Sequence, residues 1–114
     1  MGAGAVLSSD GSSTQDPVAL SPQFYVVKAD DARVRVLEYR LKPGQKEAMH
    51  SHPGYVVYFF GPGKLQVTFG DGKTTESTVT EGEVVVRDPL THAAENIGTT
   101  EVHALLVELK GTVR

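Results

Sequence analysis

The sequence predicts an all-β domain, and three observations lead to this prediction. Short runs rich in β-branched and aromatic residues alternate with turn residues between Phe24 and Leu109. Glycine, proline, asparagine and aspartate recur between the runs at nearly regular spacing. No stretch of about 12 residues carries an apolar helical stripe with capping residues. Many short strands at such spacing are typical of a β-sandwich or a β-barrel.

Seven of these runs are predicted as strands. The clearest contains Leu65, Val67 and Phe69, which alternate with polar residues as in a half-buried strand. The Gly70-Asp71-Gly72 that follows predicts a hairpin, because tight turns of this kind need positive φ. Asp88–Thr91 is predicted as a turn. The seven runs are Phe24–Val27, Arg33–Leu41, Tyr55–Phe60, Lys64–Phe69, Thr74–Thr80, Glu83–Val86 and Val102–Leu109.

The chain of 114 residues is long enough for one domain. Residues 1–16 are mostly small or polar and show no periodicity, and Pro17 and Pro22 precede the first strand. We therefore expect a flexible N-terminal arm over residues 1–20 and a single domain over residues 21–114.

Composition excludes several classes of function. The absence of cysteine excludes disulfides, thiolate metal ligands, iron–sulfur clusters and a cysteine nucleophile. The 11 Lys and Arg residues against 14 Asp and Glu residues argue against a nucleic-acid partner. No run approaches the roughly 18 apolar residues that span a membrane, and no secretory signal is recognisable. A small-molecule partner and a cytoplasmic location are the expectations that remain.

The histidines are the main candidates for chemistry. His50 and His52 form an H-S-H pair, and in a strand both rings would project from one face, about 7 Å apart at the Cα atoms. Imidazole nitrogens bind a divalent ion at about 2.0–2.1 Å, so such a pair can chelate one metal. The alternative is a pair of exposed histidines on an edge strand.

The surrounding residues resemble the cupin superfamily, whose first motif is G, five residues, H-x-H, three or four residues, E, six residues, G. Its second motif runs from G through P-x-G to H-x-x-x-N. The resemblance extends from about Phe24 to Leu109, with a spacing one residue short and the second glycine missing in the second motif. The matching residues are Gly44, His50, His52 and Gly63 in the first motif, and Gly82, Pro89, His92 and Asn96 in the second.

The resemblance implies a double-stranded β-helix, or jelly-roll barrel, with His50, His52 and His92 as metal ligands. Within the superfamily, the chain is similar to small single-domain RmlC-like cupins, including those associated with β-alanine degradation. Proteins of this size in the family are usually homodimers, so the resemblance also implies a homodimer. Val56 stands where the motif places its glutamate, and a valine cannot coordinate a metal.

This substitution leaves two interpretations open. In the first, three histidines hold a divalent metal as in the dioxygenases that lack the carboxylate ligand, and the substrate is a small oxygenated molecule. Iron is then the expected metal, while zinc, nickel, manganese, cobalt and copper also suit imidazole ligands. In the second, the barrel is a non-catalytic or metal-free small-molecule-binding protein, an accessory cupin of small-acid catabolism.

Strand parity guides the choice of further pocket residues. Glu47 and Glu95 alternate away from His50 and His92, so neither is expected to replace the missing glutamate unless a bulge intervenes. Tyr58 shares the parity of Val56 and is predicted to line the pocket as a phenol donor, with a core position as the alternative. His103, in the last strand, is expected to pack or to face solvent.

Overall fold

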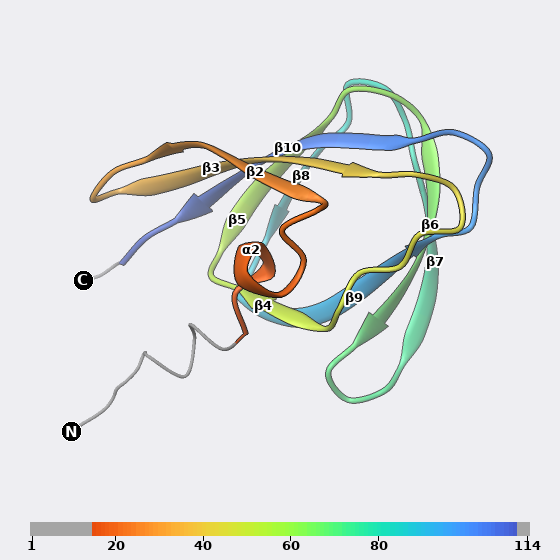
Figure 1. The fold of residues 1–114 in the computed structure, drawn as a ribbon, viewed down its shortest axis with the longest axis horizontal. Helices are drawn as coiled ribbons and strands as arrows, with labels where there is room; N and C mark the ends of the chain where they lie inside the picture. Colours follow the sequence, from red (N-terminus) through yellow and green to blue (C-terminus); the bar gives the residue numbers. More distant parts are fainter. Residues whose placement is uncertain (1–14, 112–114) are drawn as a thin grey trace.

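The computed structural model describes residues 15–111, which form two facing β-sheets and one short helix (Figure 1). The elements in chain order are α2 (Pro17–Leu20), β2 (Tyr25–Asp30), β3 (Val34–Leu41), β4 (His50–His52), β5 (Tyr55–Phe59), β6 (Gly63–Phe69), β7 (Thr74–Val79), β8 (Val84–Arg87), β9 (Leu90–Asn96) and β10 (Val102–Leu109).

The strands divide into a five-stranded sheet, β2-β3-β10-β5-β8, and a four-stranded sheet, β4-β9-β6-β7. All strand pairs are antiparallel. The first sheet is one wall of a barrel and the second is the wall that faces it (Figure 1). This architecture confirms the predicted all-β class. None of the helices among residues 15–111 is long and apolar enough to cross a membrane.

The core lies between the two sheets because the inward side chains of each strand are apolar. In β10 the side chains of Val102, Ala104 and Leu106 are buried and alternate with half-buried ones. The register places Leu106 between Leu37 of β3 and Val57 of β5, so the apolar residues form continuous rows across the sheet. Burying each valine or leucine side chain of these rows contributes about 1.5–3 kcal/mol.

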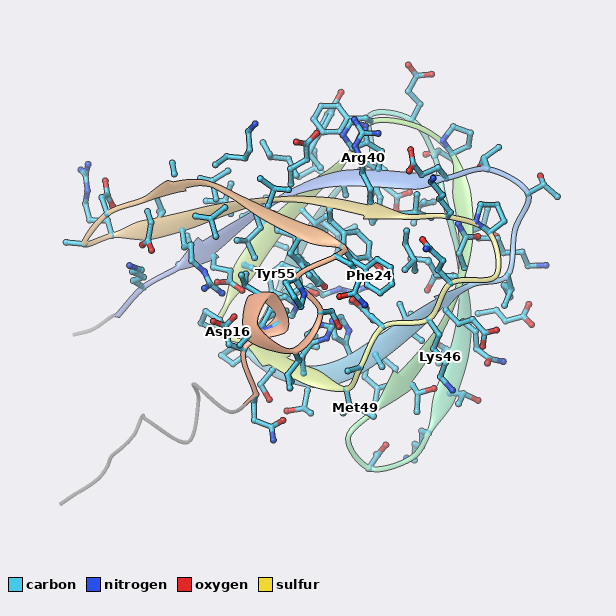
Figure 2. All side chains as sticks on the ribbon, viewed as in Figure 1. Asp16, Phe24, Arg40, Lys46, Met49 and Tyr55 are labelled. Carbon is cyan, nitrogen blue, oxygen red and sulfur yellow. The ribbon has the colours of Figure 1, made fainter. Side chains whose placement is uncertain are left out.

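Figure 2 shows the side chains that fill the barrel and those that surround it. Phe24 and Tyr55 are buried, whereas Arg40, Lys46 and Met49 lie on the outside. The interior is therefore mostly aromatic and aliphatic, and a polar group found inside it needs an explanation.

The predicted hairpin at Gly70-Asp71-Gly72 is confirmed. Strands β6 and β7 pair from Gly63 opposite Val79 to Thr68 opposite Thr74. Gly72 has a φ of 91°, which side chains other than glycine rarely adopt, and its amide donates to the Phe69 carbonyl at 2.9 Å.

The sequence prediction did not include β9. It treated Asp88–Thr91 as a turn, whereas the strand begins at Leu90 and continues to Asn96. The inward positions of this strand include His92 and Ala94, which line the barrel cavity, so the apolar alternation of an ordinary half-buried strand is missing.

Helix α2 lies within the segment that was expected to belong to a flexible arm. Asp16 caps it by accepting a hydrogen bond from the Val18 amide at 3.1 Å, and Pro17 occupies its first turn. The helix packs against β2 and β4, with Pro17 buried. Of the predicted arm, residues 1–14 lie outside the described residues.

Candidate metal centre

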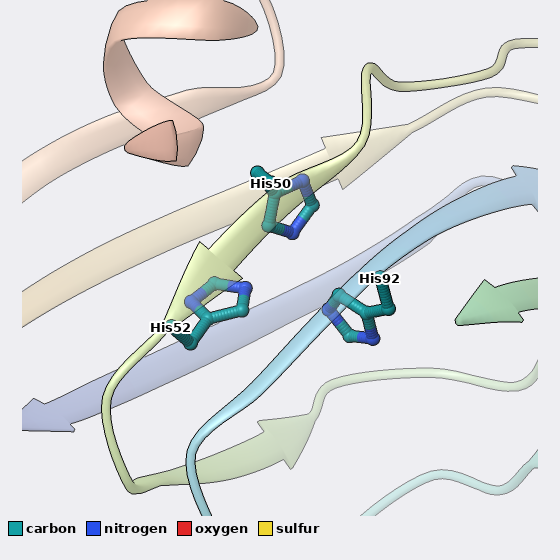
Figure 3. A group of neighbouring side chains, drawn as sticks. All are labelled: His50, His52 and His92. Atoms are coloured by element: carbon teal, nitrogen blue, oxygen red, sulfur yellow. The ribbon is translucent and has the colours of Figure 1, made fainter. Parts of the chain in front are cut away.

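Three histidines from two neighbouring strands converge on one point inside the barrel (Figure 3). Strand β4 pairs with β9 so that His50 stands directly opposite His92. His52 lies two residues along the same strand and therefore on the same face. One ring nitrogen from each histidine lies within 4.8 Å of the others, and the rings of His50 and His52 are buried. The three side chains are close enough together to bind a single metal ion.

The residue between the two ligands on β4 points the other way. The Ser51 hydroxyl lies 2.6 Å from the Thr91 hydroxyl, which belongs to the adjacent residue pair of β4 and β9. This contact supports the short pairing of β4 with β9 and so helps to hold His50 opposite His92.

The hydrogen bonds of His50 fix its tautomer. Its Nδ1 lies 2.8 Å from the Ala48 carbonyl oxygen, which can only accept, so Nδ1 carries the proton. Nε2 is then an unprotonated acceptor that faces the cluster. The Ala48 amide in turn donates to the buried Ser21 hydroxyl at 3.2 Å, which connects the His50 support to the residue after α2.

His52 is arranged in the same way by a carboxylate. Its Nδ1 lies 2.8 Å from Glu108 Oε2, and its Nε2 is buried without a hydrogen-bond partner among residues 15–111. A buried polar nitrogen without a partner is costly, and metal coordination is one way to satisfy it. Histidine ligands in metal sites usually donate their other N–H to a carboxylate or a carbonyl, and His50 and His52 show one case of each.

Glu108 belongs to a chain of ion pairs that begins at the helix cap. Arg35 stands opposite Glu108 in the β3–β10 register and donates from Nε to its Oε1 at 2.9 Å. The same guanidinium binds both carboxylate oxygens of Asp16, at 2.7 and 3.1 Å. The hydrogen bond to Asp16 is the main influence that raises the pKa of Arg35. These contacts hold the Glu108 carboxylate in position beside His52.

Burial keeps two of the rings neutral. Desolvation lowers the pKa of His50 to about 4 and that of His92 to about 3, and the neighbouring histidines add to both shifts. A neutral imidazole is the form that coordinates a metal, so these two side chains are ready to bind at neutral pH.

The cluster opens into a cavity of about 330 Å³ between the sheets. Its wall is mainly aromatic and aliphatic, and His52, His92 and Glu47 are among its polar lining residues. A volume of this size admits a small organic molecule.

The structure corrects the expected position of the missing glutamate. In β5 the side chains of Tyr55, Val57 and Phe59 are buried and line the cavity, whereas Val56 and Tyr58 alternate away from it. The four-residue spacing of the motif applies, and Val57 is the residue that takes the place of the glutamate. Tyr58 is 39% exposed and packs against Phe60 outside the barrel, so it does not line the pocket.

A second correction concerns Glu47, which was expected to face away from the cluster. Its side chain is buried, lines the cavity, and brings Oε1 to 3.8 Å from His50 Nδ1. Strand parity fails here because the chain is irregular between an isolated bridge at Lys46 and the start of β4. Burial raises the pKa of Glu47 to about 8.

Sequence reasoning missed Tyr25 altogether. Its hydroxyl donates to Glu47 Oε1 at 2.7 Å and lies 3.4 Å from His50 Nε2. Tyr25 belongs to the first strand of the five-stranded sheet, far from either histidine motif in the sequence, and no spacing rule connects it with them.

The other polar residues named from the sequence have structural contacts. Asn96 donates to the carbonyls of Leu41 and Thr100, both at 2.8 Å, and accepts from the Gly98 amide. His103 lies 2.7 Å from Glu38 and packs on Phe60, outside the histidine cluster.

The comparisons with known proteins agree with the fold. The cupin domain family model matches residues 37–108. A cupin domain protein from Bordetella pertussis Tohama I is 30% identical with a TM-score of 0.70, covering 76% of this chain and 92% of that chain. No curated protein matches the chain.

Two further solved structures share the fold at lower identity. A protein with a double-stranded β-helix domain from Klebsiella pneumoniae subsp. pneumoniae is 22% identical with a TM-score of 0.63, covering 82% of this chain and 84% of that one. An RmlC-like cupin from Methanocaldococcus jannaschii is 19% identical with a TM-score of 0.58, covering 75% and 79%. These two likenesses concern the fold alone.

The fold and the site together define a small single-domain β-barrel with a histidine cluster that is able to bind a metal. The chain belongs to the cupin superfamily.

Proposed function

We propose that this cupin binds one divalent metal ion through His50, His52 and His92 and acts as an Fe(II)-dependent dioxygenase on a small oxygenated substrate. The observation that carries the metal site is the Nε2 atom of His52. It is buried and unpartnered among residues 15–111 while Nδ1 is held by Glu108. Zinc, nickel, manganese, cobalt and copper suit the same three imidazoles.

The donor set fits such an ion. Three neutral imidazoles leave the full positive charge of a divalent metal uncompensated, which favours an anionic, chelating substrate. When bound, iron would supply Lewis acidity and redox chemistry toward O₂. Val57 adds an apolar surface where the family motif has a carboxylate, and Tyr55 and Phe59 extend that surface along the same strand. These side chains would exclude water and favour a substrate with an apolar body.

The same substitution supports a second candidate function. A barrel without the motif carboxylate is compatible with a non-catalytic or metal-free cupin that binds a small molecule, as an accessory protein of small-acid catabolism. The cavity of about 330 Å³ is available for such a ligand without any metal.

Metal content and oxygen uptake distinguish the two candidates. Protein purified without chelators or a histidine tag should contain close to one metal per chain, and oxygen uptake should be screened with diketones and related small acids. A triple variant, H50A/H52A/H92A, that retains as much metal as the parent would overturn the metal site. A rise in melting temperature with a small acid, without turnover, would support the accessory protein.

We also propose that the protein is a homodimer that uses the outer face of the five-stranded sheet. The strand registers align the outward residues Val36, Val107, Val56 and Val86 in one row across β3, β10, β5 and β8. Val86 is 73% exposed on the edge strand β8, an unusual position for an isolated chain to leave in water. Light scattering on the parent and on V86K tests this proposal, with a dimer expected for the parent and a monomer for the variant.

A further inference from the structure

Tyr25 places an oxygen atom beside the histidine cluster, and neither the sequence motifs nor the family match assigns it a role. Its ring centroid lies 5.8 Å from that of His50 and 6.5 Å from that of His52, and its hydroxyl oxygen is 3.4 Å from His50 Nε2. Tyr25 is 4% exposed and lines the same cavity as His52 and His92. The hydroxyl is therefore held inside the barrel, beside the cavity that His52 and His92 also line.

His50 Nδ1 and the Tyr25 hydroxyl each make a shorter hydrogen bond to another group. His50 Nδ1 donates to the Ala48 carbonyl, so Nε2 offers only a lone pair. The Tyr25 hydroxyl donates its single proton to Glu47 at 2.7 Å, a normal O–H···O distance. Tyr25 Oη and His50 Nε2 lie 3.4 Å apart, and each carries a lone pair that a metal ion could use.

Donor atoms that bind one tetrahedral ion at about 2.0–2.1 Å stand about 3.4 Å apart, and a six-coordinate ion brings them to about 3.0 Å. The observed 3.4 Å is the separation expected for two ligands of the same ion.

The family motif supplies its carboxylate ligand from β5, where this chain has Val57, an apolar residue that lines the cavity. Tyr25 comes from β2, which lies at the edge of the same sheet. Compared with the family motif, this chain therefore lacks the oxygen donor on β5 and has the Tyr25 hydroxyl on β2.

We infer that Tyr25 Oη is the fourth protein ligand of the metal held by His50, His52 and His92, bound as the phenolate after its proton is released to solvent, with Glu47 as the hydrogen-bond partner that orients it. This inference rests on the proposed metal site. In a six-coordinate ion, four protein donors still leave positions for substrate.

The test compares Y25F with Y39F. Tyr39 is a matched control, because its ring lies 4.9 Å from that of Tyr25 in the same cavity, and its hydroxyl has no hydrogen bond to a histidine among the described residues. Co(II) affinity is measured by titration for the parent and both variants, and Fe(III)-loaded protein is examined for an oxygen-to-iron charge-transfer band in the visible spectrum. The melting temperature of each metal-free protein reports folding.

The expected result is a visible charge-transfer band in the parent and in Y39F that is absent in Y25F, together with a loss of Co(II) affinity of at least about tenfold in Y25F alone. Equal Co(II) affinity and identical Fe(III) spectra in the parent and Y25F would overturn the inference and leave the three-histidine site intact. A parent protein that binds neither metal would overturn the proposed function itself, so the two failures are distinguishable.

Discussion

Glu108 Oε2 lies 2.8 Å from His52 Nδ1, and both side chains are buried. This contact decides which nitrogen of His52 faces the cavity, because the carboxylate holds the proton on Nδ1 and leaves Nε2 free. The metal site therefore depends on a residue of the last strand, 56 positions further along the chain.

Removing the charge of Glu108 should weaken metal binding. We expect E108Q to lower Co(II) affinity by about 10- to 100-fold, because the amide no longer fixes the His52 tautomer. Titration followed by absorption measures this. E101Q is the control, since Glu101 pairs with Arg40 at the surface, and an E108Q affinity equal to that of E101Q would contradict the role given to Glu108.

Removing Arg35 should destabilise the fold. The side chain of Arg35 is 17% exposed, and in R35M it would leave the buried carboxylate of Glu108 without its cationic partner. We expect a loss of about 3 kcal/mol in the free energy of unfolding, measured by urea denaturation. R40M, which affects a half-exposed surface pair, should cost less than about 1 kcal/mol. Equal losses in the two variants would contradict the prediction that the buried ion pairs of Arg35 contribute more to stability than the surface pair of Arg40.

The metal-free protein should lose stability below neutral pH through His50 and His92. Their pKa values are lowered from 6.5 to about 4 and about 3, so the unfolded chain binds more protons between about pH 4 and pH 6.5. Stability is fully present above pH 6.5 and falls as the pH drops, by up to about 1.4 kcal/mol per pH unit for each group. Urea denaturation from pH 7 to pH 4 measures the slope, and H92Q should show a smaller one. An unchanged slope in H92Q would contradict the prediction.

Glu47 should act in the opposite direction and in a higher window. Burial raises its pKa from 4.5 to about 8, so the folded protein binds the extra proton between these values. The contribution to stability is present below pH 4.5 and is lost as the pH rises through 8. Between about pH 7.5 and pH 8.5, where His50 and His92 are nearly neutral in both states, the metal-free parent protein should become less stable as the pH rises. E47Q should remove that decline, and a decline of the same size in E47Q would assign it to another group.

The barrel could be predicted from local signals because its strands repeat simple patterns. Leu65, Val67 and Phe69 alternate with polar residues, and the glycines around Asp71 mark the following turn. Such patterns involve residues that are neighbours in the sequence, so a single sequence is enough to reveal them. Strand β9 was missed because its inward residues include His92, a polar residue that lines the cavity. The strand therefore lacks the regular alternation of apolar and polar residues.

The candidate site could be predicted only in part, for a related reason. The histidine spacing and the family motif pointed to His50, His52 and His92, and the structure brings these three together. Parity then failed at Glu47, where the backbone is irregular, and the choice of a three-residue motif spacing placed Val56 and Tyr58 on the wrong face. Tyr25 and Glu108 are brought to the histidines by strand pairing across the sheet, which local sequence cannot reveal.

Metal content per chain, before and after reconstitution with Fe(II), is the most direct measurement of the proposed function. Elemental analysis of the parent should give close to one metal per chain, and the H50A/H52A/H92A variant should give none above background while remaining folded. A folded parent that binds no metal after reconstitution, or a triple variant that binds as much as the parent, would contradict the three-histidine centre.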